Sequence, residues 1–194
     1  MLIYVIRHGQ TDWNAELRLQ GQRDIALNDL GRQQATGNGE ALGRLLGADA
    51  AHFDYVSSPL WRTRETMERL RTAMGLAPDG YRTDARLKEV SFGDWEGLTL
   101  PEVEARDPQR LAARDASKWD FLPPGAEAES YEILSWRVAS WLSEVDRPTV
   151  CVCHGGVIRS LFKLVGGMDG DEAALGAIPQ DRILLLRHGA IGWL

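Results

Sequence analysis

The chain has 194 residues, of which 44% are hydrophobic and 26% are charged, a balance typical of a globular protein and not of a disordered or repetitive one. This length predicts a single domain over residues 1–194, because single hydrophobic cores stop growing at roughly 250–300 residues. The net charge of −6 at pH 7 excludes a surface devoted to nucleic acid, which attracts clustered basic residues.

The longest apolar stretches, residues 2–6 and 183–186, are far shorter than the ~20 residues of a membrane-spanning helix. We recognise no secretory signal ahead of the first polar motif. Cys151 and Cys153 would share one face of a strand in poor geometry for a bridge, which predicts two reduced thiols. We therefore expect a cytoplasmic protein that binds neither membranes nor nucleic acid.

Apolar runs alternate with helical patterns along the chain. Residues 2–6 predict a strand that is buried on both faces, and Asn28 predicts the N-cap of the helix that follows. Residues 53–56 predict a second strand. Ser58 and Pro59 then predict the N-cap and the first position of the next helix.

A short strand is predicted over residues 82–87. The least regular part of the chain comes next, and we expect an insertion that covers the functional site around residues 98–130. Within it, Thr99 and Glu102 form the pattern of a capping box. A further helix is predicted to begin after Ser130.

The third part of the chain repeats the opening arrangement of strand, histidine, glycine and helix. A strand is predicted over residues 149–153, a helix over 157–165, a last strand over 183–186 and its hairpin partner over 189–194. This alternation predicts an α/β fold, a three-layer α/β/α sandwich with a mostly parallel central sheet. The active site of such a fold is expected at the C-terminal ends of the strands.

Polar motifs follow four of the predicted strand ends, so that residues far apart in sequence would meet in one crevice. They supply two histidines, His8 and His154, and two arginines, Arg7 and Arg62. Guanidinium groups match phosphate oxygens, and N–H groups at the helix start after Gly155 would add to them, which predicts a phosphoryl-transfer pocket. The motifs are RHGQTDWN at 7–14, SSPLWRTRET at 57–66, LKEVSFGDWEG at 87–97 and CHGGVIRS at 153–160.

These motifs, in this order, resemble those of the histidine phosphatase superfamily, also called the phosphoglycerate mutase-like family. Further matches are LQGQRDIALNDLGRQQA at 19–35, PPG and ESYEILSWR within 123–137, and HGG at 154–156. The resemblance covers nearly the whole chain. One departure is PPGAEAES, which carries extra residues in the segment that covers the site in this family.

The resemblance implies that His8 is the nucleophile, which forms a phosphohistidine, and that Glu89 protonates the leaving group. It also implies that the phosphoryl oxygens are bound by Arg7, Asn14, Arg62 and His154, in addition to the backbone N–H groups expected at Gly155. Because two arginines near His8 oppose its protonation, we expect the pKa of His8 to be lowered. No metal or other cofactor is implied, since arginines and histidines supply the positive charge.

Trp13, Gln20, Gly21 and Trp61 lie close to the motif residues in sequence and are candidates for the pocket wall. Glu96 lies in the same loop as Glu89, and the residues alone leave the choice between these two carboxylates open.

Two of the four histidines fall outside these roles. His52 carries no supporting motif, which predicts a surface or strand-edge residue. His188 sits in a second RHG, but only five residues follow Gly189, so we predict the turn of a terminal hairpin.

Several alternatives remain open. Residues 153–160 also fit C-x-x-G-x-x-R-S, the phosphate loop of cysteine-dependent phosphatases, with Cys153 as nucleophile. A phosphate-binding module without turnover is a second rival, and a phosphoglycerate mutase-type phosphotransferase a third. The expected partner is a small phosphorylated metabolite, for example a sugar phosphate, a phosphoglycerate or alpha-ribazole phosphate. The sequence does not determine the oligomeric state, and a dimer is one of the options.

Overall fold

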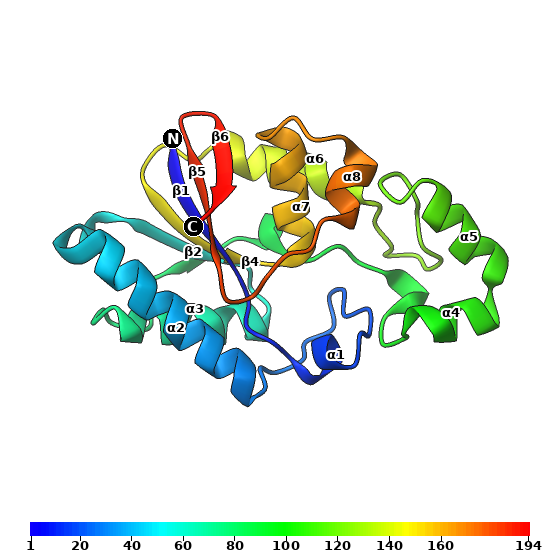
Figure 1. Cartoon of the computed structure of the whole chain (residues 1–194), viewed down its shortest axis with the longest axis horizontal. Coiled ribbons are helices and arrows are strands. Elements are labelled where there is room, and N and C mark those ends of the chain that lie inside the picture. Colours follow the sequence, from blue (N-terminus) through cyan, green and yellow to red (C-terminus); the bar gives the residue numbers. More distant parts are fainter.

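The strands form one six-stranded sheet in the order β3-β2-β4-β1-β5-β6, in a computed structural model that describes residues 1–194 (Figure 1). Four neighbouring strands are parallel, and β5 and β6 run antiparallel at one edge. The strands are β1 Leu2–Arg7, β2 Asp54–Ser57, β3 Arg82–Thr83, β4 Thr149–Cys153, β5 Ile183–Arg187 and β6 Ala190–Trp193.

The register of the central strands brings the two predicted site histidines together. Arg7, the last residue of β1, lies opposite Cys153, the last residue of β4. Since both strands are parallel and end at the same level, His8 and His154 leave the sheet side by side. Ser57 at the end of β2 lies beside Val152 of β4, so the loop after β2 reaches the same edge.

Helices cover both faces of the sheet, because the alternating side chains of β1 are apolar in both directions. Ile3 and Val5 belong to a core of 20 buried residues on the side of α6 and α7. Tyr4 and Ile6 belong to a core of 9 residues on the side of α2 and α3. The helices are α1 Asp12–Ala15, α2 Asp29–Leu46, α3 Trp61–Ala73, α4 Leu100–Arg106, α5 Pro108–Ala116, α6 Tyr131–Ser143, α7 Gly155–Leu164 and α8 Gly170–Leu175, and 3-10 turns occupy Gly47–His52, Ala85–Leu87 and Gly93–Trp95.

This architecture confirms the predicted three-layer sandwich with a mostly parallel sheet. Asn28 caps α2 through its side chain, and Thr99 with Glu102 forms the predicted capping box of α4. The terminal hairpin is also present, with His188 and Gly189 in its turn at positive φ. None of the helices has the length and apolar character that crossing a membrane requires.

The start predicted for the helix after β2 is wrong by two residues. Leu60, and not Ser58, is the N-cap of α3, whose first residue is Trp61. The N–H of Ser58 instead donates to the carbonyl of Val152 at 3.0 Å, which prolongs the strand pairing. Tertiary pairing therefore outweighs the local capping signal of Ser58 and Pro59.

Two further segments differ from the sequence prediction. The strand predicted over residues 82–87 is only two residues long and continues as a 3-10 turn. Residues 98–130 contain α4, the helix expected after the Thr99–Glu102 capping box, and a second helix, α5, that was not expected; both project from the sheet in Figure 1. Pro108 marked this segment as irregular, but it stands within the first positions of α5, where no backbone donor is required.

Candidate active site

His8 lies directly after β1 and is 2% exposed. Its backbone N–H donates to the carbonyl of Cys153 at 2.9 Å, which fixes it to the end of β4. Its Nδ1 lies 2.8 Å from the carbonyl oxygen of Gly9, and because a carbonyl only accepts, Nδ1 carries the proton. In the neutral ring, Nε2 therefore has a free lone pair, which is the form a nucleophile requires.

The loop behind His8 is held by close backbone packing. A side chain at Gly9 would collide with the backbone of Gly31 in the first turn of α2, so glycine allows the helix to approach the loop. The N–H of Gly9 donates to the hydroxyl of Thr66 on α3 at 3.1 Å. These contacts with α2 and α3 fix the backbone next to His8, and with it the position of the imidazole ring.

The pKa of His8 is lowered well below its ordinary value, which confirms the expectation from sequence. Burial is the largest cause, and the charges of Arg62 and Arg7 add to it. His8 is therefore neutral at physiological pH.

Arg7 and Arg62 supply positive charge that no carboxylate neutralises by direct contact. Arg62 donates to the carbonyls of Gly21 and Arg23 at 2.8 and 2.6 Å, and Arg7 donates to that of Ile178 at 2.7 Å. Burial lowers the pKa of each guanidinium to about 10, so both remain charged. The Nε atoms of both are buried without a hydrogen-bond partner in the protein, as expected of donors that serve an anion.

His154 lies behind His8, with the two rings edge to face and their centroids 5.2 Å apart. Its Nε2 is 2.8 Å from the hydroxyl of Ser58, whose oxygen also receives the N–H of Leu60 at 3.4 Å. When this hydroxyl donates to Nε2, the proton of the neutral imidazole lies on Nδ1. That Nδ1 is buried and has no partner in the protein, so in this tautomer it is a third unsatisfied donor beside the Nε atoms of Arg7 and Arg62.

The structure separates the two candidate carboxylates. Glu89 lines the pocket that contains His8 and receives the N–H groups of Val90 and Gly156 at 2.9 and 3.0 Å. Glu96 does not line the pocket. It accepts a hydrogen bond from the N–H of Gln22 and forms an ion pair with Arg23 in the loop after α1. Glu89 is therefore the carboxylate that can meet a leaving group.

Asn14 is oriented by a residue that the sequence analysis missed. The side-chain amide of Gln180 donates to Oδ1 of Asn14 at 3.0 Å and to the carbonyl of His8 at 3.1 Å. Because Oδ1 is occupied in this way, the NH₂ group of Asn14 is available to the pocket that it lines. Gln180 lies in the loop before β5, and no motif marks it.

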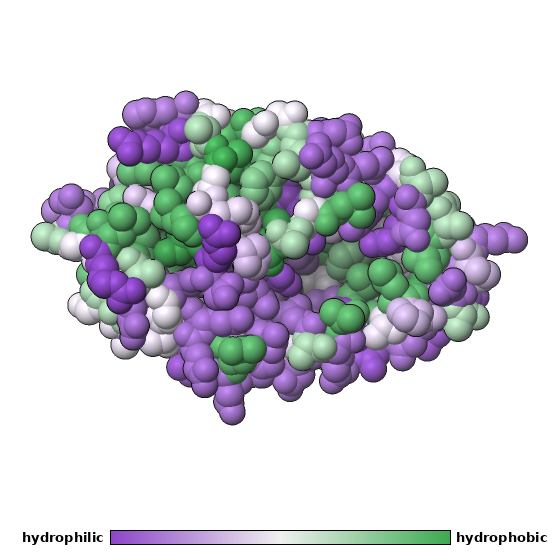
Figure 2. Space-filling view, viewed as in Figure 1, coloured by the Kyte–Doolittle hydropathy of each residue, from purple (hydrophilic) through white to green (hydrophobic).

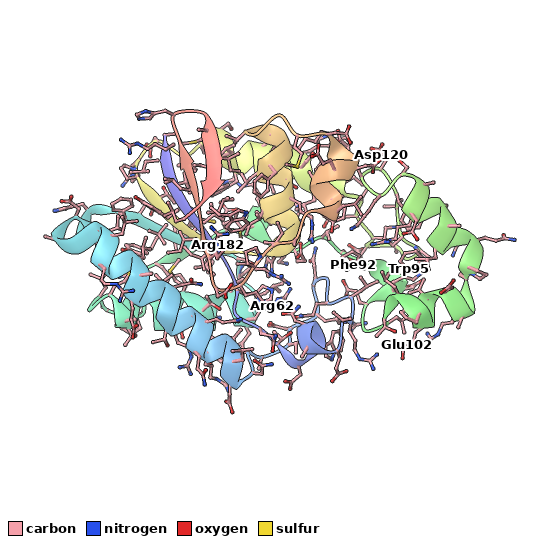
Figure 3. All side chains as sticks on the ribbon, in the orientation of Figure 1. Arg62, Phe92, Trp95, Glu102, Asp120 and Arg182 are labelled. Carbon is pink, nitrogen blue, oxygen red and sulfur yellow. The ribbon has the colours of Figure 1, made fainter.

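A pocket of about 190 Å³ lies at the C-terminal ends of the strands, and the predicted site residues that line it are Arg7, His8, Asn14, Arg62, Glu89 and Gly155. His154 is fully buried behind His8 and does not line it. Figure 2 shows the surface hollowed between the part that carries the sheet and the part that carries α4 and α5, and Figure 3 places Phe92 on the side of the latter. Of the wall candidates, Gln20 and Gly21 line the pocket. Trp13 does not and lies against Gly97, and Trp61 is half exposed elsewhere.

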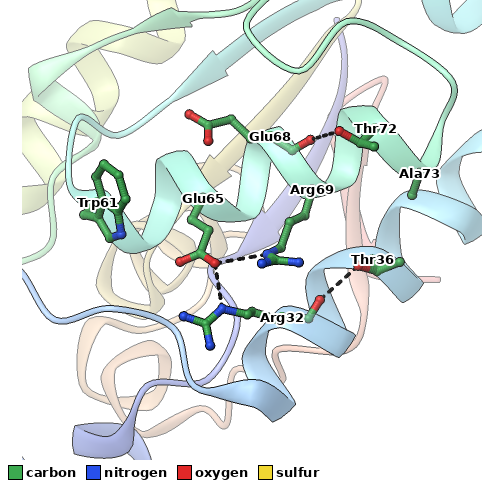
Figure 4. A pocket seen from close by; sticks show the side chains of 8 residues that line it. All are labelled: Arg32, Thr36, Trp61, Glu65, Glu68, Arg69, Thr72 and Ala73. Atoms are coloured by element: carbon green, nitrogen blue, oxygen red, sulfur yellow. Dashed lines mark hydrogen bonds and ion pairs between the residues drawn. The ribbon is translucent and has the colours of Figure 1, made fainter.

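Trp61 lines a different groove, between α2 and α3 (Figure 4). This groove measures about 620 Å³, but its charges neutralise one another. Glu65 pairs with Arg32 at 2.8 Å and with Arg69 at 3.0 Å. The groove therefore lacks the unpaired cations of the pocket at His8. The expectation that Trp61 belongs to the pocket wall is wrong, because Trp61 lies at the first position of α3, is 51% exposed and lines this groove instead.

Cys153 is the last residue of β4, and its fully buried thiol does not line the pocket. Burial is the largest cause that raises its pKa well above the ordinary value. A thiolate nucleophile needs the opposite environment, so the geometry argues against a cysteine mechanism. Both cysteines are free thiols, as predicted.

The pocket also contains cations that the sequence analysis did not assign. Arg18, Arg114, Lys118 and Arg159 line it together with Tyr131. Arg159 belongs to the C-x-x-G-x-x-R-S match, which was a signal of anion binding, but Arg114 and Lys118 come from the 98–130 segment, where no motif marks them.

Known proteins are similar to this chain in sequence and in fold. Glucosyl-3-phosphoglycerate phosphatase of Mycobacterium tuberculosis is 40% identical over 171 residues, which cover 82% of this chain and 72% of the relative. The 2,3-bisphosphoglycerate-dependent phosphoglycerate mutase of Azorhizobium caulinodans is 29% identical over 197 residues, 97% of this chain and 93% of the relative.

A solved structure of the mycobacterial glucosyl-3-phosphoglycerate phosphatase with VO3 superimposes with a TM-score of 0.76 at 33% identity and covers 100% of this chain and 96% of that one. The family model of the histidine phosphatase superfamily (branch 1) matches residues 3–193. On the fold, the sequence and the span of this match, the chain belongs to the histidine phosphatase superfamily.

Proposed function

We propose that this enzyme hydrolyses small phosphomonoesters through a phosphohistidine formed on Nε2 of His8. The observation that carries the proposal is the hydrogen bond from Nδ1 of His8 to the carbonyl of Gly9, which leaves Nε2 unprotonated among two buried arginines.

In the first step, the lone pair of Nε2 attacks phosphorus and the bond from phosphorus to the leaving oxygen breaks. Arg7, Arg62, Nδ1–H of His154 and the amide of Asn14 hold the phosphoryl oxygens, whose charge spreads in the transition state. Glu89 gives its proton to the leaving oxygen. The products of this step are an alcohol, phospho-His8 and the carboxylate of Glu89.

In the second step, Glu89 takes a proton from a water molecule while the water oxygen attacks phosphorus. The bond from Nε2 to phosphorus breaks, its electrons return to the ring, and inorganic phosphate leaves. Glu89 is protonated again, so both residues finish the cycle in their starting form.

The single domain and its insertion fit this function. α5 and the residues after it bring Arg114 and Lys118 to the pocket, which supports the proposal that residues 98–130 cover the site. The pocket of about 190 Å³ is smaller than the ~300–1,000 Å³ of sites for drug-sized ligands, which supports a small substrate.

The names of the relatives indicate a substrate class. They specify glucosyl-3-phosphoglycerate for the mycobacterial phosphatase and phosphoglycerate for the mutase, which are phosphomonoesters of small metabolites. The higher identity to the phosphatase favours hydrolysis over mutase-type transfer to a second alcohol.

The test is phosphate release from p-nitrophenyl phosphate by the wild type, His8→Ala and Cys153→Ser. We expect His8→Ala to lose at least ~10³-fold in rate, because the nucleophile is gone. Cys153→Ser should keep most of the activity. If Cys153→Ser is the inactive variant, the assignment of the nucleophile is wrong, and if the wild type is inactive, the mutase or a binding module replaces the hydrolase.

A further inference from the structure

The guanidinium of Arg62 is held by a loop that lies far from it in sequence. Its two terminal nitrogens donate to the carbonyls of Arg23 and Gly21 at 2.6 and 2.8 Å, and the whole side chain is buried. Both carbonyls belong to residues 20–24, which form the arginine-holding loop. Because a guanidinium is planar, fixing two of its nitrogens also fixes the direction of Nε, which has no partner in the protein. The position of this loop therefore sets the position of a donor that serves the anion.

Glu96 is the side chain that fastens the arginine-holding loop. It is only 9% exposed, and its Oε1 accepts the N–H of Gln22 at 2.9 Å. Gln22 stands between the two residues whose carbonyls bind Arg62. The N–H of Phe92 and the hydroxyl of Ser91 reach the same oxygen at 3.3 and 3.4 Å, so the oxygen is itself fixed from a second side.

The close approach of Glu96 to the loop depends on the glycine at position 21. Gly21 has a φ of 53°, and a Cβ at this position would overlap Oε1 of Glu96. The carboxylate therefore packs directly against the backbone whose carbonyl binds Arg62. The far end of the loop is tied to the start of α3, where the carboxylate of Asp24 accepts the N–H of Trp61 at 2.7 Å.

The charge of Glu96 has the wrong sign for direct help at an anion site. The residue does not line the pocket and forms no hydrogen bond or ion pair with Arg62, and its one ion pair is with the exposed Arg23 at 3.3 Å. A carboxylate near a phosphoryl group repels it, so this charge by itself weakens substrate binding. A buried carboxylate in this place therefore needs another role, and its hydrogen bonds to the loop supply one.

We propose that Glu96 is a positioning residue for phosphoryl binding, which acts on Arg62 through the arginine-holding loop. The inference rests on the proposed function, in which Arg62 holds the phosphoryl oxygens. Glu96 binds the N–H of Gln22, the loop presents its two carbonyls, and the carbonyls aim the guanidinium at the anion. Releasing the loop should weaken anion binding. Electrostatic repulsion alone predicts the opposite sign, tighter binding once the negative charge is removed.

The test measures the dissociation constant of orthovanadate by isothermal titration calorimetry. Orthovanadate can adopt the five-coordinate geometry of phosphoryl transfer, and its binding requires no turnover. We expect Glu96→Ala to bind it about tenfold more weakly than the wild type, because the displaced guanidinium loses a charge-assisted hydrogen bond. Glu96→Gln should restore most of the affinity, since its amide oxygen can accept the same N–H groups while its NH₂ group faces the exposed Arg23.

A double-mutant cycle shows whether the effect passes through Arg62. In the background of Arg62→Met, Glu96→Ala should change the dissociation constant by less than about twofold, because no guanidinium remains to be positioned. Glu65→Ala is the matched control. Glu65 is a glutamate of similar burial, 14% exposed, on the same helix as Arg62, and it pairs with Arg32 and Arg69 instead. This control should keep the wild-type affinity.

Unchanged or tighter binding by Glu96→Ala would overturn the inference, and so would an equal loss of affinity with and without Arg62. If the alanine variant does not fold, Glu96→Asp takes its place in the cycle, because its carboxylate keeps the charge but ends one methylene short of the N–H of Gln22. The proposed function fails separately. A wild type that binds orthovanadate but does not hydrolyse p-nitrophenyl phosphate would leave the result for Glu96 standing.

Discussion

At the scale of single residues, the two carboxylates of one loop differ in what they contact. Glu89 lines the pocket, and Glu96 binds backbone groups beside it. The sequence predicted a carboxylate in this loop but left the choice open, because the distinction depends on where each side chain points after folding. Only the resemblance to the family favoured Glu89.

Because Glu89 lies in the pocket and Glu96 does not, we expect the rate loss in a Glu89 variant to depend on the leaving group of the substrate. Glu89→Gln should slow hydrolysis of alkyl phosphates by ~10²-fold or more, since general acid catalysis is worth ~10²–10⁴-fold. The loss should be smaller for p-nitrophenyl phosphate, whose leaving oxygen needs little protonation. Rates for a series of phosphomonoesters measure the effect, and Glu96→Gln is the control that should show no such trend. An equal loss on all substrates would contradict the role of Glu89 as acid.

Ser58 is a positioning residue for His154. In Ser58→Ala, Nε2 of His154 loses the hydroxyl that fixes its tautomer, so Nδ1–H is no longer directed to the phosphoryl group. We expect kcat/KM to fall about tenfold, the value of one hydrogen bond to a charged group. Ser58→Thr, which keeps the hydroxyl, should restore most of the activity. Failure of the threonine variant to differ from the alanine variant would show that only packing matters at this position.

At the scale of elements, α6 clamps the loop that carries the acid. Arg137 on α6 donates to the carbonyls of Arg86, Lys88 and Glu89, and it pairs with Glu129 at 2.8 Å. One guanidinium therefore fixes the backbone around Glu89. A lysine ammonium could not replace it, because it is a point charge without the planar set of donors that reaches several carbonyls at once.

Arg137→Lys should consequently act through Glu89. We expect a larger loss of rate on alkyl phosphates than on p-nitrophenyl phosphate, the pattern expected of Glu89→Gln in weaker form. The free energy of unfolding should fall by about 1–3 kcal/mol, because buried carbonyls lose their donor. Urea unfolding and the same substrate series measure both quantities. A loss of stability without any leaving-group trend would limit Arg137 to a structural role.

Most helices and strands could be predicted, because hydrophobic periodicity and helix-capping residues mark them in the local sequence. The apolar runs of β1 and β4, the Asn28 cap and the Thr99–Glu102 box are local signals, and each appears in the structure. The start of α3 could not be predicted, because Ser58 does not cap this helix. Its N–H donates to Val152 of β4 and its hydroxyl contacts His154, and both contacts exist only in the folded chain. The group of pocket cations Arg114, Lys118 and Arg159 could not be predicted either, because they meet only after the segment that follows α5 packs against α8.

At the scale of the whole molecule, the two buried histidines couple stability to pH. Burial is the largest cause that lowers the pKa of both His8 and His154 well below 6.5, and Arg62 is the next. In the unfolded chain each returns to about 6.5, so below that pH the unfolded state binds more protons than the native state. Stability therefore falls as the pH falls through 6.5.

We expect the free energy of unfolding to be lower at pH 5.5 than at pH 7.5 by about 1.4 kcal/mol for each of the two histidines. Urea titrations at several pH values measure the slope. His8→Asn removes one of the two titrating groups, so its curve should be about half as steep in this range. A wild-type curve that is flat between pH 7 and 5.5 would contradict the neutral state of both rings.

The pairing of pocket cations with carbonyls has a consequence for the encounter with substrate. The molecule carries a net charge of −6 and as a whole repels a dianion. Four cations that line the pocket donate to backbone carbonyls and pair with no carboxylate, so their charges produce a local field of the opposite sign in it: Arg7, Arg62, Lys118 and Arg159. If the net charge governed association, added salt would screen the repulsion and raise the association rate. The local field instead attracts the substrate, over a Debye length of about 10 Å at 0.1 M salt. We therefore expect kcat/KM to decrease as the ionic strength rises.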